Sequence, residues 1–137
     1  MERLDNLVKV NKLQEEAPNQ GEFDAMFSQA SEWLSDATEK NAPLSRFLLA
    51  YEAAHGFARA ALRWHGYRSN DRYIVFEVLD VTAGLETSEC RVLASCHDVR
   101  NKTQYEGASA VSDQLVSELV EITAKLQGLV AAIGPVA

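Results

Sequence analysis

Cysteine is scarce in this sequence, and its spacing excludes the usual structural uses of the residue. The 137 residues include only Cys90 and Cys96. On one helix they would lie about 9 Å apart along the axis and on different faces, so they cannot form a disulfide within one chain. The spacing also lacks partner residues for a zinc site. Free thiols are typical of a reducing compartment. We therefore expect a cytoplasmic protein with no metal and no other cofactor.

Long apolar runs and the common catalytic motifs are also missing. No run approaches the roughly 18 residues that cross a bilayer, and residues 1–5 are not followed by the apolar segment of a signal peptide. There is no Gly-rich phosphate loop, His-Glu-x-x-His, Gly-x-Ser-x-Gly or pair of Glu-x-x-His motifs. The three histidines are His55, His65 and His97, and they are dispersed. We expect no membrane association.

Positive charge is in deficit, yet it is concentrated in one segment. The net charge of −7 argues against a protein that coats nucleic acid. Residues 41–72 nevertheless carry five arginines against two acids: Arg46, Arg59, Arg63, Arg68 and Arg72 against Glu52 and Asp71. This segment either faces phosphate groups or pairs with the acidic residues of the first helices.

Apolar residues recur at helical spacing along nearly the whole chain. This pattern predicts helices over residues 2–16, 22–41, 43–65, 71–82 and 87–105. It also predicts a last helix that begins at Ser109 or Ser112 and ends at Ile133. Residues 73–76 are rich in β-forming types, but a single strand would have no partner, so we expect helix there. The fold prediction is all-α, a single domain over 1–137. Its core is an up-and-down antiparallel bundle of four main helices over about 43–133, with additional N-terminal helices in 1–41.

The predicted helix over 87–105 carries the main candidate site. One face of this helix combines apolar and polar side chains: Leu93, Cys96, His97, Arg100 and Gln104. Because Leu93 belongs to the core, Arg100 should point toward the bundle or a partner surface, where it needs acceptors. Arg100 is either an internal tie to another helix or an anion site for a nucleotide or RNA phosphate, assisted by Asn101 and His97.

A second candidate surface lies at the end of the helix over 43–65. Arg59 and Arg63 are four residues apart on one helical face, beside Trp64, His65 and Tyr67. Arginines mixed with aromatic rings are typical of surfaces that bind single-stranded RNA. Alternatively, Trp64 and Tyr67 close the core and the arginines are solvated.

Two segments together resemble the HEPN superfamily over roughly residues 43–133. The run from Ala50 to Gly66 is similar to the A-Y-x-A-x-x-x-A-x-A-L-L-x-x-x-G run of small HEPN proteins. Arg100-Asn101-x-x-x-Tyr105 resembles their Arg-polar-x-x-x-His motif, with Tyr105 in the place of the histidine. The resemblance implies a helical bundle that forms a homodimer. Many members are metal-independent endoribonucleases of toxin–antitoxin or defence systems with a cognate protein partner, and others bind RNA or nucleotides without cleaving them.

The replacement of the motif histidine bears on the expected activity. Metal-free RNA cleavage needs a group that exchanges protons near neutral pH, which suits histidine better than a tyrosine with a pKa of about 10. We therefore expect a binding module at Arg100, Asn101, Arg59 and Arg63. The alternatives are an endoribonuclease that uses Arg100 with His97 or Tyr105, and a structural or regulatory module that binds another protein.

Overall fold

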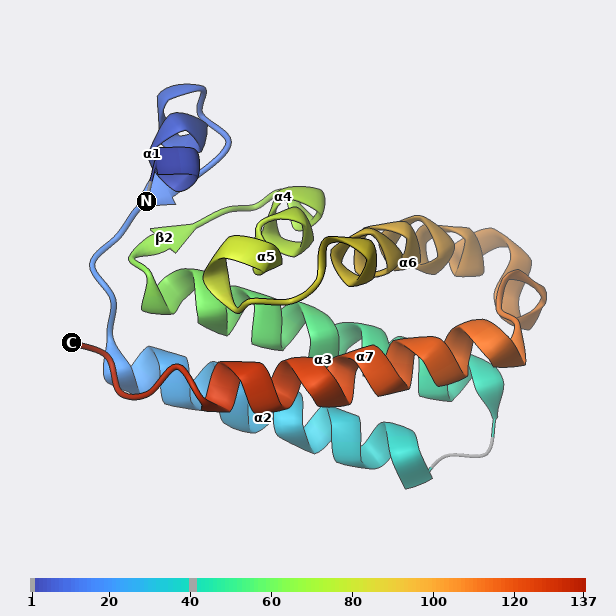
Figure 1. Ribbon diagram of the computed structural model, residues 1–137. Helices are drawn as coiled ribbons and strands as arrows, with labels where there is room; N and C mark the ends of the chain where they lie inside the picture. Colours follow the sequence, from blue (N-terminus) through green and yellow to red (C-terminus); the bar gives the residue numbers. More distant parts are fainter. Residues whose placement is uncertain (1, 40–41) are drawn as a thin grey trace.

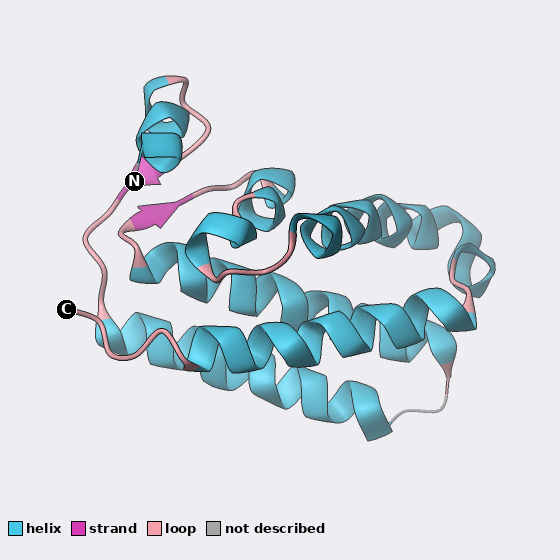
Figure 2. Cartoon of the chain, in the orientation of Figure 1, coloured by secondary structure: helices cyan, strands magenta, loops and turns pink. Residues whose placement is uncertain are grey.

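The computed structural model describes residues 2–39 and 42–137, which form an almost entirely helical chain (Figures 1 and 2). The long helices are α2 (Gln20–Glu39), α3 (Pro43–Trp64), α6 (Thr87–Glu106) and α7 (Asp113–Ala131). The short elements are α1 (Glu2–Lys9), β1 (Gln14–Glu15), β2 (Tyr67–Arg68), α4 (Arg72–Glu77), α5 (Leu79–Thr82) and the 3₁₀ helix η1 (Gly107–Ala110). The all-α prediction is confirmed.

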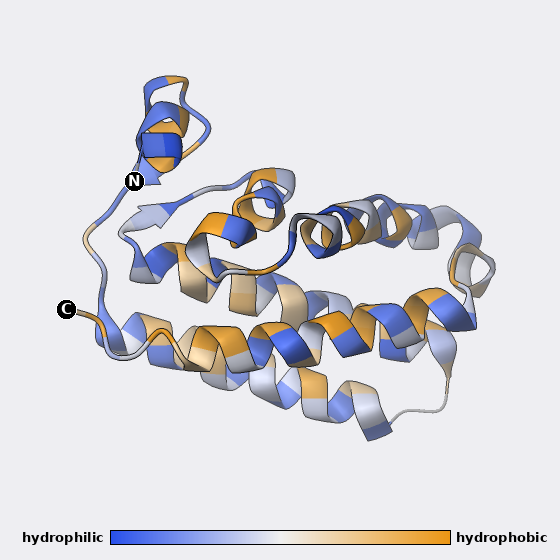
Figure 3. Ribbon diagram, viewed as in Figure 1, coloured by the Kyte–Doolittle hydropathy of each residue, from blue (hydrophilic) through white to orange (hydrophobic). Residues whose placement is uncertain are grey.

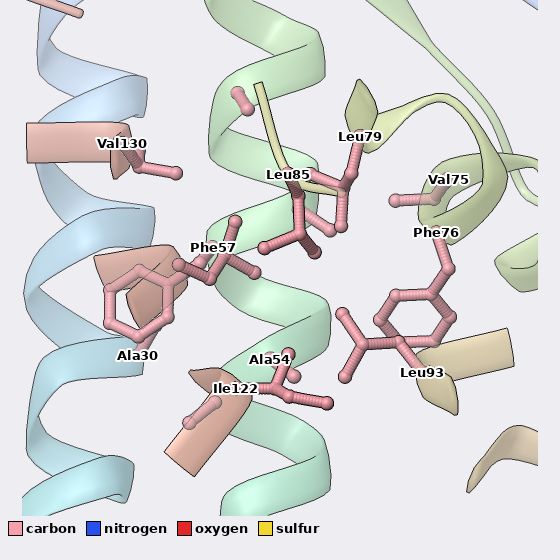
Figure 4. Packing of buried hydrophobic residues seen from close by; sticks show 14 of the residues in the cluster. Ala30, Ala54, Phe57, Val75, Phe76, Leu79, Leu85, Leu93, Ile122 and Val130 are labelled. Carbon is pink, nitrogen blue, oxygen red and sulfur yellow. The ribbon is translucent and has the colours of Figure 1, made fainter. Parts of the chain in front are cut away.

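Helix α3 is the centre of the molecule. It packs against α2 and α7 on one side and against α4, α5 and α6 on the other, so that α2, α3 and α7 run side by side while α6 crosses above them in Figure 1. Figure 4 shows core side chains from α2 to α7 converging around Ala54 and Phe57 of α3. Along each long helix, hydrophobic and hydrophilic bands alternate (Figure 3), as expected of amphipathic helices.

The alanine-rich stripe of α3 allows an unusually close contact with α2. Residue 56 is a glycine, and a Cβ placed there would lie 2.9 Å from the Cβ of Ala30. Ala30, Ala53 and Ala54 are completely buried. The small side chains of this helix therefore bring its backbone close to that of α2.

Two predicted helices differ from the observed ones. The helix predicted over 2–16 ends at Lys9, because Asn11 adopts a left-handed conformation (φ 62°), which asparagine tolerates, and the chain then pairs with a distant segment. In that pairing Gln14 lies opposite Arg68 in antiparallel register. The predicted helix over 71–82 is divided into α4 and α5 at Val78.

The last helix begins at the second of the two expected positions. The Ser112 hydroxyl accepts a hydrogen bond from the backbone N–H of Leu115 (3.1 Å) and caps α7. For α2, the expected end at Asn41 lies outside the described residues.

Burial keeps both cysteines in the thiol form. Cys90 and Cys96 are free and buried on α6, and burial raises the pKa of Cys96 to about 12. The expectation that they do not pair is confirmed. Over residues 2–39 and 42–137, no helix combines the length and the apolar character of a membrane span.

Candidate functional site

Three helices bring two arginines and a histidine around one buried tyrosine. Tyr51 of α3 has no exposed surface, and its hydroxyl lies 2.7 Å from Nδ1 of His97 on α6. Nη1 of Arg72 on α4 donates to the same oxygen (3.2 Å). The Cζ atoms of Arg72 and Arg100 lie 5.6 Å and 5.9 Å from the centre of the Tyr51 ring, within range of cation–π attraction. We call these four residues the Tyr51 cluster.

The hydrogen bonds of the Tyr51 cluster define the protonation of His97. Burial raises the pKa of Tyr51, so the phenol keeps its proton. Burial, together with the charges of Arg72 and Arg100, lowers the pKa of His97, which favours the neutral ring. Among the described residues, Nδ1 of His97 is the only acceptor within hydrogen-bond distance of the buried Tyr51 hydroxyl, because the other contact of that oxygen is the Arg72 donor. We therefore assign the Tyr51 proton to the bond with Nδ1 and the His97 proton to Nε2.

A second tyrosine covers the histidine. The Tyr73 ring stands edge-on to the His97 ring with their centres 4.7 Å apart, and the Tyr73 hydroxyl donates to the carboxylate of Asp98. This bond raises the pKa of Tyr73, so the hydroxyl keeps its proton. Tyr73 therefore fixes one side of the His97 ring and joins α4 to α6.

The two arginines of the Tyr51 cluster differ in their partners. Arg72 forms an ion pair with Glu52 at 3.5 Å. Arg100 is half-buried, and its one side-chain hydrogen bond runs from Nη1 to Oδ1 of Asn101 at 3.3 Å. In the part of the chain that the structure describes, no carboxylate and no backbone carbonyl holds the Arg100 guanidinium. Most of its five N–H donors are therefore available to a ligand.

Tyr105 does not join this group. It lies five residues beyond Arg100 on α6, about 7.5 Å further along the helix axis. Its side chain is 89% exposed. Of the residues predicted around Arg100, the structure thus brings His97 and Asn101 to it and leaves Tyr105 on the open surface.

The two arginines predicted as an RNA surface have different surroundings. Arg63 is only 5% exposed, and its guanidinium donates to the Glu22 carboxylate and to the carbonyls of Glu16 and Ala17, each at 2.9 Å. Arg68 pairs with the Glu16 carboxylate at 3.3 Å. Arg63 and Arg68 therefore pair with acidic residues near the N-terminus. This is the second of the two alternatives given for the arginine-rich segment.

Arg59 instead lies exposed beside a cleft of about 330 Å³. The cleft is lined mostly by polar side chains: Glu16, Glu22, Met26, His55, Arg59, Leu62, Arg63, Arg68, Ser69, Asn70, Arg72 and Val75. We call it the His55 cleft, after the one histidine in its wall. Arg72 borders both this cleft and the Tyr51 cluster.

The aromatic residues near Arg63 bond to the chain itself. Nε1 of Trp64 donates to the carbonyl of Gly134 (3.1 Å), and the Tyr67 hydroxyl donates to the carboxylate of Asp5. Tyr67 is buried, so its ring is not a stacking platform for a base. This agrees with the alternative in which Trp64 and Tyr67 close the core. The same alternative expected solvated arginines, which is wrong for Arg63, because that side chain is buried against Glu22 and the carbonyls of Glu16 and Ala17.

Two members of the Tyr51 cluster carried no recognisable signal in the sequence. Tyr51 reads as an ordinary inward position of an apolar stripe, and Arg72 as one charge among five. Their roles depend on contacts across 46 and 21 residues, respectively. Only the shared face of His97 and Arg100 on one helix could be inferred locally.

No three His, Cys, Asp or Glu side chains among the described residues are grouped so that they could hold a metal ion. Comparisons of the chain with models of protein families, with curated proteins and with solved structures found no match.

Proposed function

We propose that this protein binds a phosphate-bearing ligand, RNA or a nucleotide, at the Tyr51 cluster, and that Arg100 is the residue that contacts the phosphate. The observation that carries the proposal is the half-buried Arg100 guanidinium, which has a single neutral side-chain partner in the described chain. A guanidinium in such surroundings is stabilised by an anion that supplies the missing acceptors.

The neighbouring groups favour phosphate as that anion. Arg72 places a second positive charge over the Tyr51 ring, with its Cζ atom 5.6 Å from the ring centre. The planar fork of an arginine matches two phosphate oxygens at once. With Nδ1 occupied by Tyr51, His97 offers an N–H at Nε2, which is a further donor. Asn101 adds a side-chain amide beside Arg100.

The same hydrogen bonds favour binding over cleavage. A general base needs a free lone pair within reach of the proton that it removes. The Nδ1 lone pair of His97 is engaged by the Tyr51 hydroxyl, and Tyr105 is not part of the cluster. The second candidate function, a metal-independent endoribonuclease, would require His97 to change its bonding or a proton carrier from a partner.

A homodimeric HEPN-like protein is part of the proposal. The up-and-down bundle of four main helices is expected from the helical pattern, and a second copy at the Arg100 face is expected from the resemblance. The two free thiols suit a cytoplasmic location. Light scattering after size-exclusion chromatography measures the mass in solution. Twice the chain mass supports the dimer, and the mass of one chain contradicts it.

An assay on labelled single-stranded RNA in EDTA tests binding and cleavage together. Wild type and Arg100→Ala are compared, with Tyr105→Phe as a third sample. We expect RNA to be bound intact by wild type and Tyr105→Phe and to be released by Arg100→Ala. Cleavage by wild type that Arg100→Ala abolishes would instead establish the nuclease. If wild type neither binds nor cleaves RNA, and does not bind mononucleotides, the result would favour a module that binds another protein.

A further inference from the structure

We propose that the His55 cleft is a second anion site, which binds the phosphate group of a small phosphomonoester or inorganic phosphate through Arg59 and His55. The cleft lies between α2, α3, α4 and β2, and Arg72 is the one residue that it shares with the Tyr51 cluster. The inference does not depend on the function proposed for Arg100.

His55 is the first observation that points to a ligand. Its side chain is only 9% exposed and belongs to the wall of the cleft. Its ring packs edge-on to Phe76, with the centres 5.8 Å apart, and no hydrogen bond to it is found within residues 2–39 and 42–137. A neutral imidazole has one N–H and one lone pair. Among the described residues, Oγ1 of Thr82 is the only buried side-chain polar atom without a partner, so the unpaired nitrogens of His55 open onto the cleft, where a ligand can reach them. A bound molecule would satisfy them.

Arg59 is the second observation. It borders the same cleft, one turn along α3 from His55, and forms no ion pair within the described parts of the chain. The other cations of the cleft are already engaged: Arg63 by Glu22, Arg68 by Glu16, and Arg72 by Glu52. Arg59 is therefore the guanidinium in this cleft that is free to take up a new acceptor.

The charge of the wall selects an anion. Four arginines and two glutamates line the cleft, which leaves an excess of positive charge in a protein whose net charge is −7. Burial, and secondly the nearby charges of Arg72 and Arg59, lower the pKa of His55 to about 3. His55 is therefore neutral near pH 7 and adds an N–H donor without adding a charge. A phosphate dianion matches this balance.

The size and the apolar part of the wall limit the ligand. A volume of about 330 Å³ is at the small end of ligand sites in proteins. Met26, Leu62 and Val75 supply apolar surface, and Ser69 and Asn70 supply polar groups. This lining fits a phosphate that carries a short organic part, such as a sugar, and is too small for a folded or polymeric ligand to enter.

The test follows the ring nitrogens of the histidines by NMR while a ligand is added to the full chain. With only three histidines, the His55 signals are identified by their loss in His55→Gln. The probes are inorganic phosphate, ribose 5-phosphate and, as the uncharged control, ribose. Arg59→Gln tests the second ligand residue, and Arg91→Gln, an exposed arginine of α6 outside the cleft, is its matched control.

We expect saturable shifts of the His55 signals with phosphate or ribose 5-phosphate and none with ribose. Arg59→Gln should weaken the affinity about tenfold, because it removes a charge-assisted hydrogen bond, and Arg91→Gln should not change it. If ribose 5-phosphate binds more tightly than inorganic phosphate, the ligand of the cleft is an organic phosphomonoester. If the two bind equally, the cleft recognises the phosphate group alone. The proposal is overturned if neither phosphate compound moves the His55 signals or if Arg59→Gln binds as wild type does. Arg100→Ala should retain these shifts of the His55 signals. The proposal for the His55 cleft and the proposal for Arg100 can therefore be contradicted separately.

Discussion

Arginines of identical chemistry have opposite roles in this protein. Arg63 is buried and fully engaged by Glu22 and by two backbone carbonyls, whereas Arg100 is half-buried with a single amide partner. The difference arises from the groups that the fold brings to each guanidinium. Arg63 therefore stabilises the protein, and Arg100 is available for function.

Removal of the Arg63 guanidinium should destabilise the fold. Arg63→Gln breaks the ion pair to Glu22 and leaves the carbonyls of Glu16 and Ala17 without their donors. Because Glu22 is partly exposed, we expect a loss of about 2 to 3 kcal/mol in the free energy of unfolding, measured by chemical denaturation. Arg59→Gln, one turn away and exposed, should change it by less than about 0.5 kcal/mol. Equal effects of the two substitutions would contradict this assignment.

His55 makes stability depend on pH. Its pKa is about 3 in the folded protein and about 6.5 in an unfolded chain. The unfolded state thus binds the proton first as pH falls, so the stability that is fully present above pH 6.5 is lost progressively toward pH 3. From pH 8 to pH 5 the expected loss is about 2 kcal/mol. This range lies above the titration of ordinary carboxylates.

Denaturation curves of wild type and His55→Gln at pH 8 and pH 5 measure this contribution. The loss on acidification should be about 2 kcal/mol smaller in the variant, because glutamine does not titrate. The pKa of His97 is lowered as well, so a part of the pH dependence should remain in His55→Gln. An unchanged pH dependence would show that His55 is not buried as a neutral ring.

At the scale of the element, two helical glycines have opposite surroundings. A Cβ at Gly56 of α3 would lie 2.9 Å from the Cβ of Ala30, whereas a Cβ at Gly128 of α7 would meet nothing within 4 Å. Alanine is the better helix former by about 1 kcal/mol at either position.

The two Gly→Ala substitutions should therefore change stability in opposite directions. Gly128→Ala should raise the free energy of unfolding by about 0.5 to 1 kcal/mol. At Gly56 the crowding of α2 against α3 outweighs the helical preference, and we expect a loss of about 1 kcal/mol. Thermal or chemical denaturation measures both. Stabilisation by Gly56→Ala would mean that α2 and α3 are not in close contact.

The helices could be predicted from the sequence because the spacing of their apolar residues and their capping residues depend only on neighbouring positions in the chain. The stripe of α3 and the Ser112 cap of α7 are examples. The end of α1 at Lys9 could not be predicted, because it depends on the left-handed Asn11 and on pairing with residues 67–68. Nor could the division at Val78, since the apolar stripe continues through it.

At the scale of the whole molecule, the candidate site was only half visible in the sequence. Arg100, Asn101 and His97 lie within one turn of α6, so helical geometry alone places them together. Tyr51 and Arg72 come from other helices, and their contacts depend on how α3, α4 and α6 pack. The motif resemblance also included Tyr105, which the fold leaves exposed, since spacing along a helix does not determine which side chains meet a ligand.

The affinity for single-stranded RNA tests the central claim most directly. Equilibrium binding of a labelled RNA in EDTA is measured for wild type, Arg100→Gln and Arg91→Gln, the last being a control for loss of one exposed charge on the same helix. We predict saturable binding that Arg100→Gln weakens at least about tenfold, because a charge-assisted contact to phosphate is lost, with Arg91→Gln within about twofold of wild type. Equal affinities of Arg100→Gln and wild type would contradict the account.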